Sequence, residues 1–321
     1  MKQKTIFILS LLFSVVIHSG AQTSISKNSN NKNSQTKKIS MSRNNMEKAY
    51  KVSGKIVTER LIAEDPSNRE IIAGVSRDDL VVIDGDFDHM HLVLSSLELP
   101  FVRIDHDELP GYTFKPHQTV FVNCAASFPA NQAKKIASFV AAGGQLITTD
   151  WALKYVLEKA FPGYISYNQR PSTDEVIQVE IIDKEDPVVR GFWDEETQPV
   201  WWLEGMSYPI RVLNKNKVKV LIRSDELKEK YGEDAVLVRF EYGKGVVYHM
   251  LSHFYLQRTE VKNVIQEERA EKYVIVKGAS KNKRIMEDVK HLNYGEVQSA
   301  NTSSEFIMRA VINQMRRNKG K

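Results

Sequence analysis

The stretch GGQLITTDWALKYVL, from Gly143 to Leu157, decides the fold. A glycine pair is followed by a short apolar run, a bend at residues 149–151 and a helical pattern that begins with ALKYVL. This succession predicts a buried strand that turns directly into a helix, which is the layout that α/β enzymes use to present a nucleophile. The residue at the bend is Asp150.

Asp150 has three interpretations. As a helix cap, its carboxylate would accept amide hydrogens at the start of the following helix, a contribution of about 1 kcal/mol. As a catalytic group it needs a partner, and His253 is the candidate. A pair of Asp and His side chains can activate water or hold a metal ion. Ligand recognition is the third interpretation, and we expect capping.

The flanking sequence extends the same architecture. Continuous apolar runs in DDLVVIDG, PFVRID and TVFVNCAA alternate with helical segments such as NQAKKIASFVAAGG. Such runs are typical of strands covered on both faces, and alternation with helices indicates a parallel sheet. After Phe161 the chain becomes rich in strands, with VIQVEII, VKVLI, AVLVRFEYG and GVVYHMLS. We therefore predict an α/β fold with a mostly parallel sheet, helices on both faces and a β-rich C-terminal half.

Residues 1–21 are predicted to be a bacterial Sec-type signal peptide. MKQKTIFILSLLFSVVIHSGAQ combines a basic start, an apolar run and small residues before the expected cleavage after Ala21. An uncleaved anchor needs about 20 apolar residues, and His18 interrupts this run too early. Cys124 is the single cysteine, which excludes an internal disulfide. We expect a secreted or periplasmic protein with no membrane span after cleavage.

Composition divides the rest of the chain. Residues 22–60 are predicted to be a disordered basic tether, because Ser, Asn and Lys dominate at its start. The net charge of +5 lies in the termini, since residues 61–315 hold 30 basic and 38 acidic side chains. Such an acidic body argues against nucleic acid as a partner. Residues 61–256 are expected to form the α/β domain, and residues 257–321 a charged helical excursion and a closing helix capped by serine.

Three segments carry a resemblance to a known family. They are IASFVAAGGQLITTDWAL, EDPVVRGF and EYGKGVVYHMLSHF, in this order between about Leu80 and Phe254. Together they resemble the class I glutamine-amidotransferase-like superfamily, which implies a flavodoxin-like sheet. In active members of that family the bend after the glycine pair carries a cysteine, and a His followed two residues later by Glu completes a catalytic triad.

The resemblance implies a degenerate triad in this chain. Position by position, the nucleophile falls on Asp150, the base on His253 and the orienting acid on Tyr255. Amide transfer needs a thiolate nucleophile and a carboxylate that orients the imidazole, so we predict that the protein is not a glutamine amidotransferase. The resemblance places Cys124 near an oxyanion site, and a lone cysteine at a strand end is more often a buried small hydrophobe.

Two further clusters are candidates for ligand binding. The loop IDGDFDHMH brings Asp84, Asp86 and Asp88 together with two histidines at the expected carboxyl end of a strand, where a hard cation could bind. The competing interpretation is that Asp84 and Asp88 cap the helix that begins near His89. The segment PVWWLEGMSY offers paired tryptophans beside Glu204, which suits either sugar stacking or core packing.

These observations favour an exported, non-catalytic amidotransferase-like domain that binds a ligand or a protein. The partner is an unidentified small molecule, glycan or protein, and the sequence identifies neither a cofactor nor a metal. The expected ligand-binding residues are Asp84, Asp86, Asp88, Trp151 and Glu204. The alternative is a hydrolase, with or without a metal ion and acting on carbohydrate, in which Asp150 and His253 are the catalytic residues. A third hypothesis is a scaffold that assembles through residues 257–301.

Overall fold

A computed structural model describes residues 26–192, 200–255 and 264–320. The chain divides into two compact units, Met1–Ser40 and Met41–Lys321, and the second unit contains the sheet. The predicted signal peptide lies outside the described residues. Among the residues that are described, no helix is long and apolar enough to cross a membrane.

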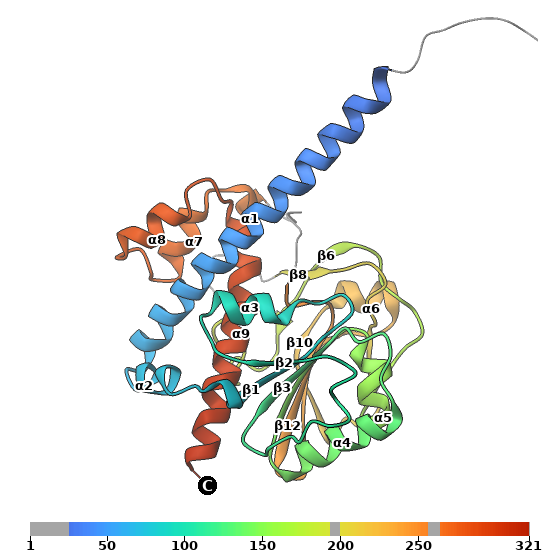
Figure 1. Cartoon of the computed structure of the whole chain (residues 1–321). Coiled ribbons are helices and arrows are strands. Elements are labelled where there is room, and N and C mark those ends of the chain that lie inside the picture. The colour runs from blue at the N-terminus through green and yellow to red at the C-terminus, as the bar shows by residue number, and fades with distance from the viewer. Residues whose placement is uncertain (1–25, 193–199, 256–263, 321) are drawn as a thin grey trace, which may run out of the picture. The chain divides into compact units, whose positions relative to one another are not determined.

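A mostly parallel sheet forms the centre of the second unit (Figure 1). Its parallel part has the strand order β2-β1-β3-β4-β12, which is the flavodoxin-like order 2-1-3-4-5. The strands are β1 (Leu80–Ile83), β2 (Val102–Ile104), β3 (Thr119–Asn123), β4 (Gln145–Thr149) and β12 (Gly245–Met250). All residues of β1, β3, β4 and β12 are buried, which explains their continuous apolar runs.

Antiparallel strands extend this sheet beyond β12, so the expected α/β fold with a β-rich C-terminal half is confirmed. The order continues β12-β11-β10-β7, and β9 pairs with both β11 and β5. A separate ribbon pairs β6 with β8. The strands are β5 (Ile165–Tyr167), β6 (Glu175–Gln178), β7 (Glu180–Ile181), β8 (Val200–Leu203), β9 (Ile210–Val212), β10 (Val218–Arg223) and β11 (Ala235–Tyr242).

Helices cover both faces of the parallel strands (Figure 1). On one face lie α4 (Ala130–Ala142), the π-helix η2 (Leu153–Leu157) and α5 (Glu158–Ala160). The other face carries α3 (Met90–Ser96), α9 (Tyr294–Lys319) and the C-terminal part of α1 (Ser26–Glu64). The remaining helices are α2 (Asn68–Ala73), η1 (Arg77–Asp79), α6 (Asp225–Tyr231), η3 (Val264–Glu267), α7 (Ala270–Val276) and α8 (Lys283–Asp288).

The C-terminal part of α1 differs from the disordered tether expected over residues 22–60. Residues 46–61 are helical, and their apolar side chains recur at helical spacing in the core: Met46, Ala49, Tyr50, Ile56, Val57 and Leu61. The helix also forms an ion pair between Arg60 and Glu305 of α9, with 2.8 Å between nitrogen and oxygen. The polar composition of residues 23–45 hid this amphipathic segment, because low average hydrophobicity does not exclude one apolar stripe.

Helix α9 begins earlier than the serine-capped closing helix expected from the sequence. Its N-terminus is a capping box in which the Asn293 side chain accepts from the Glu296 amide and the Glu296 side chain accepts from the Asn293 amide. The expected serine cap is therefore wrong. Ser303 and Ser304 are buried within the helix. The first turns of α9 are polar in sequence, so the sequence did not indicate that the helix begins at Tyr294. Residues 257–263 of the expected helical excursion lie outside the described residues.

Replacing Tyr50 tests the packing of α1. This fully buried ring stacks on Tyr255 with 4.8 Å between ring centroids, and its hydroxyl donates to the Phe254 carbonyl. Tyr50→Ala should lower the free energy of unfolding by about 3–5 kcal/mol because it leaves a cavity. Tyr50→Phe should cost about 1 kcal/mol or less, since Ser303 still donates to the same carbonyl. Urea denaturation measures both, and an unchanged Tyr50→Ala variant would contradict the packing.

His249 should make stability depend on pH. It is fully buried in β12, its Nδ1 lies 2.8 Å from Thr148 Oγ1, and burial lowers its pKa to about 3. Because an unfolded histidine has a pKa of about 6.5, the unfolded chain binds more protons below that pH. This contribution to stability should therefore fall as the pH decreases from about 6.5 towards 3, by up to about 1.4 kcal/mol per pH unit.

The variant His249→Asn isolates this effect. Asparagine keeps a polar group near Thr148 but does not titrate, so its free energy of unfolding should change less between pH 7 and pH 4.5 than that of the wild type. Urea denaturation at both pH values gives the two differences. Equal differences in the variant and the wild type would show that His249 is not the group that titrates.

Candidate functional site

Three neighbouring parallel strands place Cys124, Asp150 and His253 at one edge of the sheet. Asn123, the last residue of β3, pairs with Thr149 of β4, and Thr149 pairs with Met250 of β12. The ladder continues one step further, since the Cys124 amide donates to the Thr149 carbonyl and the Asp150 amide donates to the Met250 carbonyl, both at 3.0 Å. This is the carboxyl edge at which doubly wound sheets bind ligands.

The chain turns sharply where each of these strands ends. Cys124, Asp150 and Ser252 have φ values of 42°, 46° and 73°. Residues other than glycine rarely adopt this left-handed backbone conformation, and each residue that does so destabilises the fold by about 1–3 kcal/mol. The surrounding structure must offset the backbone strain of these three residues. Backbone strain of this kind is concentrated at functional sites.

The carboxylate of Asp150 is buried and held by a distant segment. Its Oδ2 accepts from Ser207 Oγ and its Oδ1 accepts from the Tyr208 amide, both at 2.8 Å. The expected helix cap is therefore wrong: η2 starts after Ala152 and receives no side-chain cap. Ser207 and Tyr208 lie 57 and 58 residues further along the chain, so the local pattern around the bend did not reveal these donors.

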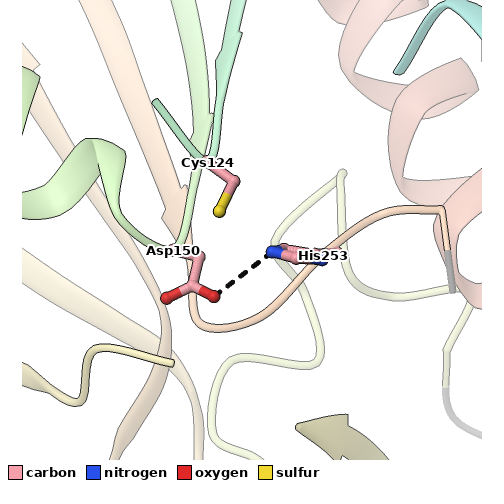
Figure 2. Close-up of side chains that lie close together, drawn as sticks. All are labelled: Cys124, Asp150 and His253. Atoms are coloured by element: carbon pink, nitrogen blue, oxygen red, sulfur yellow. Dashed lines mark ion pairs between the residues drawn. The ribbon is translucent and has the colours of Figure 1, made fainter. Parts of the chain in front are cut away.

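His253 completes the cluster. Its Nε2 lies 3.3 Å from Asp150 Oδ2, and its side chain is 9% exposed (Figure 2). Burial alone would lower the pKa of His253, but the Asp150 carboxylate, with Cys124 and Asp88, outweighs burial and raises the pKa well above its usual value. The Cys124 thiol is also buried, and burial raises its pKa. One donor atom from each of Cys124, Asp150 and His253 lies within 4.8 Å of the others.

Asp88 braces the loop that carries His253. Its buried carboxylate accepts from Thr149 Oγ1 at 2.9 Å and from the amides of Phe254 and Tyr255 at 3.0 and 3.2 Å. One carboxylate therefore connects the ends of β1, β4 and β12. Asp88 therefore positions the main chain next to His253. Its own side chain does not line the pocket beside Asp150 and His253.

Asp84 and Asp86 also have protein partners. Asp84 Oδ1 pairs with Arg103 Nε at 2.6 Å, and Asp86 Oδ2 accepts from the Ala126 amide at 2.5 Å. Helix α3 begins after His89 without a side-chain cap, so the capping expected of Asp84 and Asp88 is wrong. The acidic loop is therefore bound to β2 and to the segment that follows β3, and its own sequence does not indicate these partners.

A pocket of about 410 Å³ opens above the three clustered side chains. Its lining consists of Phe87, His89, Cys124, Asp150, Trp151, Glu204, Gly205, Met206, His253 and Tyr255. Asp150, Trp151, Glu204 and His253 were predicted as site residues, and the structure brings these four together. Phe87 and Met206 were missed, although their exposed fractions of 54% and 55% mark them as accessible apolar side chains.

The paired tryptophans near Glu204 pack in the core, which was the alternative to sugar stacking. Trp201 and Trp202 are 6% and 4% exposed, and Trp201 Nε1 donates to the Leu251 carbonyl at 2.8 Å. Trp151 is the pocket tryptophan. Its Nε1 donates to the Met206 carbonyl at 2.8 Å, and its ring stacks on Tyr208 with centroids 5.6 Å apart.

Comparisons with known proteins establish no family. No family model and no curated protein matches the chain. Solved structures similar to it include a putative ThuA-like protein from Bacteroides uniformis, with 8% identity over 69% of this chain and 95% of that one and a TM-score of 0.40. A cytoplasmic protein from Salmonella typhimurium LT2 has 13% identity over 54% of this chain and 87% of that one, with a TM-score of 0.39. A cold-adapted β-galactosidase from Rahnella sp. R3 has 13% identity and a TM-score of 0.39, over 54% of this chain but 28% of the enzyme.

Coupling between Asp150 and Ser207 tests the geometry of the bend. Asp150→Ala should cost about 2–4 kcal/mol of unfolding free energy, because it leaves the Ser207 hydroxyl and the Tyr208 amide buried without an acceptor. Ser207→Ala should cost about 1 kcal/mol. Since the two side chains share a hydrogen bond, the double variant should cost less than the sum of the single variants. Urea denaturation measures the four proteins of the cycle, and strict additivity would contradict the contact.

Proposed function

We propose that this protein is an exported, amidotransferase-like domain without amide-transfer chemistry, and that it binds a small neutral carbohydrate in the pocket above Asp150 and His253. The single observation that carries the proposal is the lining of this pocket, which combines aromatic side chains with carboxylates and histidines. Its volume of about 410 Å³ is in the range of small-molecule sites.

The charges of the lining favour a neutral ligand. Asp150 and Glu204 contribute carboxylates, and none of the ten lining residues is Lys or Arg. Phosphate and nucleotide ligands are usually bound by Arg, Lys or the amides at a helix N-terminus. Sugar hydroxyls, by contrast, donate hydrogen bonds to carboxylates and imidazoles without bringing a charge into the site.

The aromatic walls are held in place before any ligand arrives. Trp151 is fixed by its hydrogen bond to Met206 and its stacking on Tyr208, and Phe87 packs edge-on against it with ring centroids 5.0 Å apart. Tyr255 is fixed by stacking on Tyr50. A rigid aromatic surface loses little conformational entropy on binding, and the apolar face of a sugar ring can pack on it.

A hydrolase is the second candidate, and the 3.3 Å approach of Asp150 and His253 favours it. Both side chains line the pocket, so water beside a bound sugar would lie within reach of a carboxylate and an imidazole. By the resemblance to amidotransferases, Asp150 and Tyr255 would occupy the positions where amide transfer needs a cysteine and a carboxylate, which supports a function other than glutamine hydrolysis.

Binding of neutral sugars tests the proposal. Isothermal titration of the purified protein with a panel of neutral mono- and disaccharides, and with their phosphorylated counterparts, should give saturable binding of a neutral member only. Trp151→Ala should weaken that binding about 30-fold, because it removes a central aromatic contact worth about 2 kcal/mol. Leu213→Ala, which changes an exposed apolar residue outside the pocket, is the matched control and should bind like the wild type.

The same samples separate the two candidate functions. A sugar that is recovered unchanged after prolonged incubation indicates a binding protein. Cleavage that Asp150→Asn abolishes indicates the hydrolase. Binding of phosphorylated sugars alone, or binding that Trp151→Ala leaves unaffected, would contradict the proposed ligand and its place.

A further inference from the structure

The cluster at the floor of the pocket has the chemistry of a metal site. A thiol sulfur, a carboxylate oxygen and an imidazole nitrogen, all from buried residues, lie within 4.8 Å of one another. Ligand atoms around tetrahedral zinc are about 3.3–3.5 Å apart, given bond lengths of about 2.3 Å to one sulfur and 2.0 Å to nitrogen and oxygen. Small inward movements of Cys124, Asp150 and His253 would bring the three donors to these separations.

The donors converge on one point instead of forming a relay. In a relay of Cys, His and Asp, the histidine uses one ring nitrogen for the nucleophile and the other for the carboxylate. Figure 2 shows that the His253 nitrogen nearest Asp150 is also the one on the side of the Cys124 sulfur, while the other nitrogen is turned away from both. Nε2, which faces Asp150, has no hydrogen bond of good geometry to any described residue, although the side chain is nine-tenths buried.

The supporting contacts are those of a preorganised metal site. Asp150 is held by Ser207 and Tyr208, and these hydrogen bonds leave lone pairs on the carboxylate. The main chain beside His253 is held by Asp88 through the next two amides. Hydrogen bonds of this kind orient the ligands of natural metal sites and raise their affinity for the metal.

We propose that Cys124, Asp150 and His253 bind a zinc ion. A set of one sulfur, one nitrogen and one oxygen suits zinc, whereas magnesium and calcium require oxygen ligands. All three residues line the 410 Å³ pocket, so the fourth coordination position faces the space proposed for the ligand, as in catalytic zinc sites with three protein ligands. A bound zinc would polarise an oxygen atom of whatever occupies the pocket.

Metal analysis without any sugar tests this site separately from the carbohydrate proposal. The full chain, purified without a histidine tag, is treated with a chelator, dialysed against zinc and analysed by mass spectrometry. We expect about one zinc ion per chain, released again by the chelator. With Co²⁺ as the probe, a thiolate-to-metal absorption band should appear in the near ultraviolet, and it should be absent in Cys124→Ser.

Matched variants assign the ligands. Cys124→Ser, Asp150→Asn and His253→Gln should each weaken zinc binding at least about tenfold. His117→Gln is the control: His117 lies beside Asp78 and outside the pocket, so this variant should bind zinc like the wild type. Circular dichroism shows whether each variant is folded. If a ligand variant is unfolded, the thiolate-to-cobalt band of the wild type shows whether Cys124 binds the metal.

Two results would overturn the zinc site. One is a folded wild-type protein that retains no zinc after dialysis and gives no cobalt–thiolate band. The other is zinc binding of wild-type strength in folded Cys124→Ser. Sugar binding by a metal-free protein would leave the carbohydrate proposal intact, and zinc binding without any sugar affinity would leave the metal site intact.

Discussion

The register of β3, β4 and β12 is the constraint on which the site depends. Parallel pairing of these strands fixes where each one ends, and two main-chain hydrogen bonds continue the ladder to Cys124 and Asp150. A slip of one residue would turn every side chain of a strand to the opposite face, and the buried apolar side chains of the central strands oppose such a slip. The hydrophobic core therefore positions polar side chains that contribute nothing to it.

Burial makes this arrangement energetically demanding. Asp88, Asp150 and His253 are all nearly excluded from water, and a buried charge is tolerated only when it is paired or hydrogen-bonded. Asp88 accepts hydrogen bonds from one hydroxyl and two amides; Asp150 accepts from one hydroxyl and one amide and lies within ion-pair distance of the His253 imidazole. These bonds draw in the segments at residues 207–208 and 254–255, so the site and the loops around it depend on one another.

The sequence predicted those features that local pattern determines. Apolar runs and glycine punctuation were sufficient for the parallel sheet, and the general rule for such sheets placed Asp150 and His253 at the same edge. The partners of Asp150 could not be predicted, because a carboxylate at a bend has the same local signature whether it caps a helix or binds a segment 57 residues away. Residues 46–61 were expected to be disordered because the polar residues around them lower the average hydrophobicity, although one face of the helix is apolar.

Cys124 shows how tertiary structure changes the meaning of a residue. In the sequence it is a lone cysteine at a strand end, and burial of 99% agrees with an inert thiol. In the structure its sulfur shares a small space with a carboxylate and an imidazole. A carboxylate oxygen that coordinates zinc is not available to accept a proton, so water activation by Asp150 with His253 and metal binding are competing uses of the same atoms. If zinc is present, its open position would supply the polarisation for any hydrolysis; if it is absent, the carboxylate and imidazole are free to act together on water.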